Sequence, residues 1–309
     1  MTSSEVDEFV GLYQRVSTQL SFARNHYRDP ALTDELTALV ASANATLYRR
    51  TASPQAAVRR FFTIAFPAAV WHLRRFVAIA ALSTFLPAAI LAIWLSSTEE
   101  ALAFVGDEAE RAAFVNEDFE SYYSSEPAAQ FATEVLVNNI QVSFLAYAAG
   151  VFFGIGSVLL LAFNGANVGV ALALFIVAGR QAQFWGLILP HGLLELSAVV
   201  IAGAAGMALG WSLIAPGDRS RSVAFTEEAR RSVVLIMGLV LAFITAGVIE
   251  GFVTPSPAPT AVRVGIGVAV EAAFVAYIVS FGRRAALEGL TGLLDEGLEG
   301  ETGRAVLKV

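Results

Sequence analysis

Residues Ile188 to Gly210 read ILPHGLLELSAVVIAGAAGMALG. The stretch is almost wholly apolar and long enough to cross a bilayer, yet His191 and Glu195 lie in it one helical turn apart. Ionisable groups are costly in lipid and usually face a partner or a water-filled cavity. The stretch therefore predicts a membrane-spanning helix in a polytopic protein with a polar site among its helices.

The composition of the whole chain leads to the same class of protein. Apolar residues make up 56% of the sequence and charged residues 15%, which is the usage of a helical membrane protein. The absence of cysteine excludes disulfides, thiolate metal sites and cysteine nucleophiles. A formal charge of −7 gives no reason to expect nucleic acid as a partner. The first fifty residues lack the apolar run of a signal peptide, so the first membrane helix is expected to direct targeting.

Apolar runs of membrane-spanning length predict an all-α polytopic protein with about six transmembrane helices. The third run is short and rich in glycine, and Pro190 stands at the start of the fourth. The six predicted spans are residues 74–97, 138–161, 164–179, 188–214, 232–253 and 262–282.

Arginines predict the orientation, because cytoplasmic flanks of spans accumulate Lys and Arg. With six spans, one side receives Arg59, Arg60, Arg74, Arg75, Arg219, Arg221, Arg230, Arg231, Arg283 and Arg284. The opposite side receives the segment 98–137, which holds ten acidic residues and one arginine. We expect a multi-pass protein of the inner (cytoplasmic) membrane with both termini in the cytoplasm. Arg180 and Arg263 are the exceptions, and each is expected at the interface or beside a carboxylate.

Three domains are predicted from the same pattern. Residues 1–66 form a cytoplasmic helical hairpin followed by an interfacial elbow helix, because apolar residues recur there at helical spacing. Residues 67–284 form the six-span domain with its acidic extracytoplasmic segment 98–137. Residues 285–309 form a cytoplasmic amphipathic tail, in which Leu287, Leu290, Leu294 and Leu298 follow helical spacing. Within segment 98–137, aromatic residues interleave with carboxylates, which suits either a partner-binding platform or a solvated cap with interfacial anchors.

The candidate intramembrane polar site consists of His191, Glu195, Glu250 and Glu271. The predicted topology places the first three in the same leaflet, and small residues flank His191 and Glu195, so the pair is expected to face protein. Such residues relay protons or bind cations in transporters, but they also pair with one another to lock a bundle. Both alternatives remain open. Secondary polar positions are Asn138 and Asn139, which open the second span, and Asn164 and Asn167, which bracket the turn into the third.

Glycines at GxxxG spacing favour close helix packing, within the chain or in a homodimer. The positions are Gly150, Gly154, Gly206, Gly210, Gly247 and Gly251.

The sequence predicts no catalytic, cofactor-binding or metal-ligating residues. An HExxH pattern is missing, and no GxSxG-like elbow surrounds Ser143 or Ser197. An enzyme is therefore the least favoured class.

Five stretches resemble the stage II sporulation protein M family (DUF95 membrane proteins), in particular its actinobacterial branch. They are EFVGLYQRVSTQL, RRFFTIAFPAAVW, DFESYYSSEPAAQFATEVLVNNIQV, GLILPHGLLELSAVVIAGAAGMALGW and GVIEGFVTPS. The resemblance covers nearly the whole chain and implies its fold and membrane location. In endospore formers, members are similar to a membrane scaffold that drives membrane migration during engulfment together with peptidoglycan-degrading partners. Because actinobacterial members occur in bacteria without such endospores, that role does not transfer unchanged.

The expected function is a non-enzymatic membrane scaffold or partner protein in envelope or membrane-remodelling processes. Its expected partners are the lipid bilayer and membrane or envelope proteins. A transporter or channel for a small solute, ion or lipid is the alternative, and an intramembrane hydrolase built on His191 and Glu195 is the third.

Overall fold

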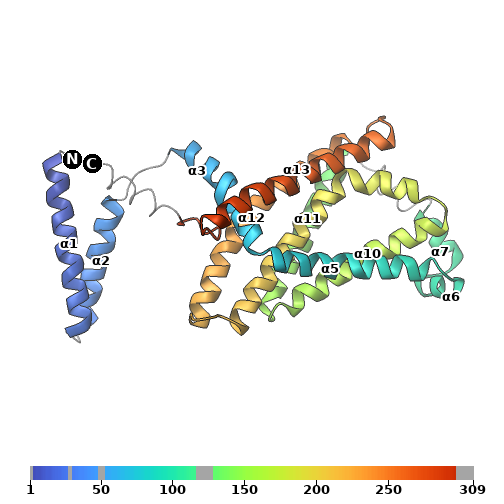
Figure 1. The fold of residues 1–309 in the computed structure, drawn as a ribbon. Helices are drawn as coiled ribbons and strands as arrows, with labels where there is room; N and C mark the ends of the chain where they lie inside the picture. Colours follow the sequence, from blue (N-terminus) through green and yellow to red (C-terminus); the bar gives the residue numbers. More distant parts are fainter. Residues whose placement is uncertain (1–2, 27–29, 48–52, 116–127, 297–309) are drawn as a thin grey trace. The chain divides into compact units, whose positions relative to one another are not determined.

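The fold is described from a computed structural model, which covers residues 3–26, 30–47, 53–115 and 128–296. These residues form helices and turns, and none of them lies in a strand (Figure 1). The chain divides after Arg59 into two compact units, each with its own internal contacts.

The N-terminal unit contains two long helices, α1 (Ser3–His26) and α2 (Pro30–Leu47). Leu20 and Ala23 are buried, and Arg24 donates a hydrogen bond to the hydroxyl of Thr37 at 3.2 Å. Pro30 opens α2, where a missing N–H costs nothing and the fixed φ favours a helix. The unit is thus a helical hairpin.

The second unit is a bundle of long apolar helices. Among the residues that the structure describes, five helices are long and apolar enough to cross a membrane, and a shorter apolar segment runs from Val135 to Val151. The chain is therefore an all-α polytopic membrane protein, as predicted. The five helices are α5 (Arg74–Leu95), α10 (Ile155–Val177), α11 (Gln181–Ile214), α12 (Arg221–Phe252) and α13 (Thr260–Leu287). The shorter apolar segment lies in α9 (Ala128–Ala148) and the turn that follows it. The shorter ones are α3 (Pro54–Arg60), the π-helical turn η1 (Phe61–Ala65), α4 (Phe66–His72), α6 (Glu99–Leu102), η2 (Ala103–Val105), α7 (Glu108–Ala113) and η4 (Ala149–Val151).

The predicted boundary between the second and third spans is wrong. The chain turns at Phe152–Gly154, inside the predicted span 138–161, because Phe153 and Gly154 adopt positive φ angles of 56° and 81°. A residue in the left-handed region ends a helix. Asn164 and Asn167, expected at the turn, consequently lie in the middle of α10, which has full spanning length.

The start of the fourth span also differs from the prediction. Helix α11 begins at Gln181, so Pro190 lies inside it and residues 181–185 are helical. At this level α13 comes close to α11, because a Cβ on Gly267 would fall on the carbonyl oxygen of Leu189. Close backbone approach of this kind requires glycine.

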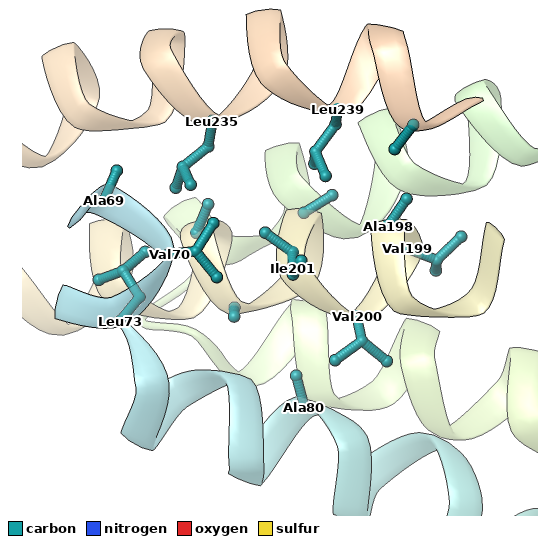
Figure 2. Close-up of a cluster of buried hydrophobic side chains, with 14 of the residues drawn as sticks. Ala69, Val70, Leu73, Ala80, Ala198, Val199, Val200, Ile201, Leu235 and Leu239 are labelled. Carbon is teal, nitrogen blue, oxygen red and sulfur yellow. The ribbon is translucent and has the colours of Figure 1, made fainter. Parts of the chain in front are cut away.

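Helix α11 forms the centre of the bundle, and 83% of its most apolar window is buried. Figure 2 shows Val200 facing Ala80 of α5, with Leu235 and Leu239 of α12 approaching α11 from the other side. Ala80 and Leu235 are fully buried. In contrast, α5 and α13 are only 17% and 11% buried over their windows, so most of their surface is available to lipid.

Glycines pack these helices against one another within the chain. A Cβ on Gly150 would collide with the backbone of Gly206, and one on Gly210 would collide with the carbonyl oxygen of Gly150. Gly154 approaches the backbone of Met207. In α12, a Cβ added to Gly247 would lie at ordinary contact distance from the side chain of Leu136, so this position does not require glycine, and Gly251 follows one turn later.

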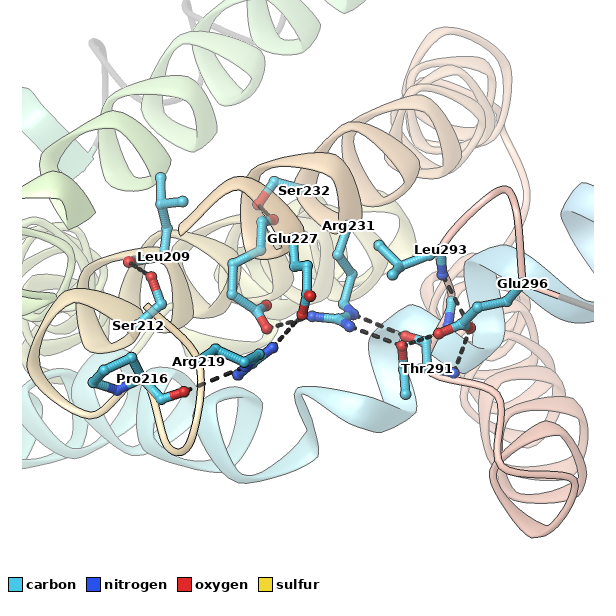
Figure 3. Close-up of polar contacts among 12 residues, drawn as sticks. Leu209, Ser212, Pro216, Arg219, Glu227, Arg231, Ser232, Thr291, Leu293 and Glu296 are labelled. Atoms are coloured by element: carbon cyan, nitrogen blue, oxygen red, sulfur yellow. Dashed lines mark hydrogen bonds and ion pairs between the residues drawn. The ribbon is translucent and has the colours of Figure 1, made fainter. Parts of the chain in front are cut away.

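The chain after α13 does not continue as a helix, although the leucine spacing predicts one. Residues 288–296 form turns that dock on α12, where Arg231 donates hydrogen bonds to the carbonyl and hydroxyl of Thr291, the latter at 2.8 Å (Figure 3). Burial alone would raise the pKa of Glu296, but hydrogen bonds from Thr291, Gly292 and Leu293 outweigh it and lower the pKa. Leu298 and the rest of the predicted tail lie outside the described residues.

The acidic segment 98–137 is described in part. Thr98 caps α6 by accepting from Ala101 N–H at 3.1 Å, and Asp107 with Glu110 forms a capping box on α7. The aromatic residues Phe119, Tyr122 and Tyr123 lie outside the described residues, together with Asp118, Glu120 and Glu126. The prediction of a partner-binding platform there stays a prediction.

Candidate functional site

A network of buried polar side chains lies near the end of the bundle where α11 begins and α12 ends. His191 of α11 pairs through Nδ1 with Oε2 of Glu250 on α12, and both side chains are at most 4% exposed. Thr254 follows α12 by two residues, and its hydroxyl donates to the same Glu250 oxygen at 2.7 Å. Thr254 Oγ1 also lies 3.4 Å from His191 Nδ1. Histidine and carboxylate therefore compensate each other's burial, as intramembrane ionisable groups require.

Glu195 extends this network to a third helix. Its Oε2 lies 3.9 Å from His191 Nε2 and accepts a hydrogen bond from Asn139 of α9 at 2.7 Å. Its other oxygen, Oε1, is buried and has no hydrogen-bond partner among the described residues. The network thus ties α9, α11 and α12 together and leaves one carboxylate oxygen unsatisfied.

The turn after α12 carries the network to α13. Arg263 donates a hydrogen bond to the backbone carbonyl of Thr254 and lies 3.3 Å from the Thr260 hydroxyl. Arg180, the other arginine expected on this side, donates to the carbonyl of Val115 at 3.1 Å. Each guanidinium therefore donates to a backbone carbonyl, and Arg263 also contacts the Thr260 hydroxyl, contacts that the sequence did not predict.

Glu271 belongs to α13 and contacts α11 on a different face from the one that carries His191 and Glu195. Its Oε1 accepts a hydrogen bond from Ser197 at 2.7 Å, and its Oε2 is buried without a hydrogen-bond partner among the described residues. Ser197 follows Glu195 by two positions, which is about 200° around a helix. Glu271 and Ser197 line a cavity of about 270 Å³ to which His191, Glu195 and Glu250 do not contribute.

The secondary polar positions divide in the same way. Asn139 belongs to the network, whereas Asn138 is exposed on α9. Asn164 is half-buried and Asn167 is exposed, both on α10.

The chemistry of the network is that of exchangeable protons. Imidazole and carboxylate groups are the side chains that exchange protons in proteins, and Thr254 donates to the carboxylate of Glu250 beside His191. Over residues 3–26, 30–47, 53–115 and 128–296, no group of three His, Asp or Glu side chains is arranged to hold a metal ion. The cavities of about 350 and 270 Å³ are lined by other residues, so the network does not open into either of them.

Sequence comparison assigns the bundle to a family. The model of the family described as stage II sporulation protein M matches residues 81–255, which is more than half of the chain and includes the whole His191 network except Thr260 and Arg263. The chain belongs to the stage II sporulation protein M family. A second model, described as a domain of unknown function (DUF8413), matches residues 1–49, the helical hairpin of this family member.

Two archaeal proteins are similar to this stage II sporulation protein M family member. Uncharacterized protein MJ0793 of Methanocaldococcus jannaschii is 30% identical over 123 residues, which cover 39% of this chain and 69% of the relative. Uncharacterized protein MJ0706 of the same organism is 29% identical over 123 residues, covering 38% of this chain and 52% of the relative. No solved structure matches the chain. The comparisons therefore establish the family and leave its activity to be argued from the structure.

Proposed function

We propose that the protein is a non-enzymatic integral membrane scaffold that holds partner proteins in envelope or membrane-remodelling processes. The observation that carries the proposal is the hairpin α1–α2, a separate compact unit that leaves large apolar side chains exposed. Leu12, Phe22 and Leu39 are each at least 50% exposed. Exposed apolar side chains of this size are available to a protein partner, which would remove them from water on binding.

The membrane bundle supports the same proposal. A transporter needs ionisable groups that water and substrate reach, whereas His191, Glu195 and Glu250 are each at most 3% exposed and contact one another. Their arrangement ties three helices into a rigid frame. Glycine contacts between the helix backbones stiffen the frame further.

The proposed location is the inner membrane, with the hairpin and both chain ends in the cytoplasm. The arginines that precede α5, separate α11 from α12 and end α13 support this orientation. Partners of the hairpin are then cytoplasmic or membrane proteins.

A proton- or ion-coupled transporter is the second candidate, because the Glu195 Oε1 atom is buried without a hydrogen-bond partner among the described residues. A cation or an additional donor at this atom is what such a transporter requires. The two candidates make opposite predictions for variants of the network and of the hairpin.

The test replaces the chromosomal gene with variants and places a photo-cross-linking amino acid at Leu12. A scaffold predicts cross-links from Leu12 to a discrete protein partner, their loss in Phe22→Asp, and their persistence in Glu195→Gln. The matched control places the same cross-linker at Val268, an exposed position of α13, where only lipid adducts are expected.

Purified protein in vesicles loaded with a pH-sensitive dye supplies the other half of the test. A scaffold predicts proton flux no greater than in protein-free vesicles. Flux above that level that disappears in Glu195→Gln, with no hairpin cross-links in cells, would establish the transporter and overturn the scaffold.

A further inference from the structure

A cavity of about 270 Å³ lies between α4, α5, α11 and α13, away from the His191 network. Its walls are mostly apolar, and Phe85, Val275 and Val279 among them are between 41% and 50% exposed. These residues belong to α5 and α13, the two spans with the largest surface available to lipid. The cavity is therefore accessible to molecules dissolved in the lipid phase.

Glu271 supplies the acidic group of this apolar wall. Ser197 satisfies its Oε1, but Oε2 is buried and lacks a donor among the described residues. A carboxylate oxygen without a hydrogen bond in an apolar environment costs free energy. Glu271 lines the cavity, so a bound molecule that brings a donor gains that energy when the carboxylate turns its buried Oε2 toward the cavity.

Trp71 of α4 and Arg74, the first residue of α5, line one end of the cavity. Arg74 donates to the Trp71 carbonyl at 3.1 Å, and its guanidinium carbon lies 5.6 Å from the centre of the Trp71 ring. Arg74 precedes Phe85 by eleven helical residues, a rise of roughly 16 Å, so the cavity extends from a cationic, aromatic end toward the interior of the membrane.

We propose that this cavity binds a membrane-soluble molecule with an apolar body and a single hydrogen-bond donor, a hydroxyl or an amine, that pairs with Glu271. Binding pockets for small molecules share this construction, with apolar walls and a few polar groups that fix orientation. A pure hydrocarbon leaves Glu271 Oε2 unsatisfied, and a strongly polar solute gains nothing from walls formed by valine, isoleucine and phenylalanine. The inference is independent of the scaffold proposal, because it rests on none of the residues of the hairpin or of the His191 network.

The test uses the full chain in lipid nanodiscs with Trp71 as the reporter. Trp94, Trp185 and Trp211 are each at least 39% exposed, so their replacement by phenylalanine leaves Trp71 as the single tryptophan at little structural cost. The probes are 12-bromododecanol, 12-bromododecylamine and 1-bromododecane, whose bromine quenches tryptophan fluorescence. We expect saturable quenching, with the alcohol or the amine binding about tenfold more tightly than the alkane, as one hydrogen bond allows. The tighter of the two identifies the donor.

Three variants assign the binding to the cavity. Glu271→Leu is expected to abolish the preference over the alkane and to stay folded, because an apolar side chain replaces an unsatisfied carboxylate. Val275→Phe is expected to remove saturable quenching by filling the cavity, whereas Val268→Phe, two turns earlier on α13 and outside the cavity, is expected to change nothing. Equal affinity for all three probes, a preference that survives Glu271→Leu, or no saturable quenching at all would overturn the proposal.

Discussion

Substitution of Glu250 is expected to reduce the stability of the protein strongly, because its side chain is buried, with the residue 2% exposed, and contacts both His191 and Thr254. Removing one partner of a buried ion pair leaves the other charge or dipole without compensation, at a cost of about 3–5 kcal/mol. We therefore expect Glu250→Ala to lower the free energy of unfolding by that amount, measured by denaturant unfolding of the purified protein in detergent.

Glu227 offers a matched control on the same helix. It pairs with Arg219, but the two side chains are 34% and 44% exposed, so Glu227→Ala is expected to cost no more than about 1 kcal/mol. Replacing His191 and Glu250 together by leucine is expected to recover most of the loss, since an apolar pair needs no compensation. A similar loss in Glu227→Ala and Glu250→Ala would contradict the account of the network.

The sequence predicted part of the candidate site at this scale. His191 and Glu195 share a helix face by their spacing, and membrane depth placed Glu250 beside them, which is the arrangement found. Thr254 was missed because a threonine in the turn after a span has no pattern that marks it as a ligand for a carboxylate. The hydrogen-bond partner of Glu271 depends on how α11 and α13 are rotated about their axes when they pack. The periodicity of apolar residues does not predict that rotation, so the contact with Ser197 was missed.

At the scale of elements, the contact of α5 with α10 depends on Gly165. A Cβ at this position would fall on the carbonyl oxygen of Thr84, a backbone atom that has no room to move because Thr84 is 1% exposed. We expect Gly165→Ala to destabilise the bundle by about 1–3 kcal/mol, the cost of overpacking a core, although alanine favours helices. The measurement is the midpoint of thermal unfolding in detergent.

Gly265 of α13 is the control for helix propensity, because nothing lies within 4 Å of a Cβ added there. Gly265→Ala is expected to leave the midpoint unchanged or to raise it slightly. The interpretation of the α5–α10 contact fails if both alanine variants behave alike.

Helices were predicted well where hydropathy changes and poorly where it does not. The first and sixth predicted spans match α5 and α13 to within a few residues, since polar or proline-rich segments flank them. The fifth matches the end of α12 but not its start, because the helix already begins at Arg221 in polar sequence. The turn at Phe152–Gly154 lies in the apolar sequence VFFGIG, so no polar signal marks it. Asn164 and Asn167 suggested a turn because asparagine is common in turns, yet a helix inside a bundle also accommodates it.

At the scale of the whole molecule, the two units differ in how much of their apolar surface is buried within the unit. The bundle buries α11 almost completely and leaves α5 and α13 to lipid, whereas the hairpin exposes leucine and phenylalanine side chains without a span of its own. The GxxxG glycines that suggested a homodimer are used in part within one chain, at Gly150, Gly206 and Gly210. Partner contacts are therefore better sought on the hairpin than on these glycines.

The proposed orientation makes a prediction that the absence of cysteine renders simple to test, since each introduced thiol is the single one in the chain. Asp218 lies in the turn between α11 and α12, and Pro257 lies in the turn between α12 and α13; both are exposed. These turns are at opposite ends of α12, so they lie on opposite sides of the membrane. We expect a membrane-impermeant maleimide to label Pro257→Cys in intact cells and Asp218→Cys only after the membrane is opened. The reverse pattern would place the arginine-rich turns outside the cell and the hairpin with them, which would exclude cytoplasmic partners.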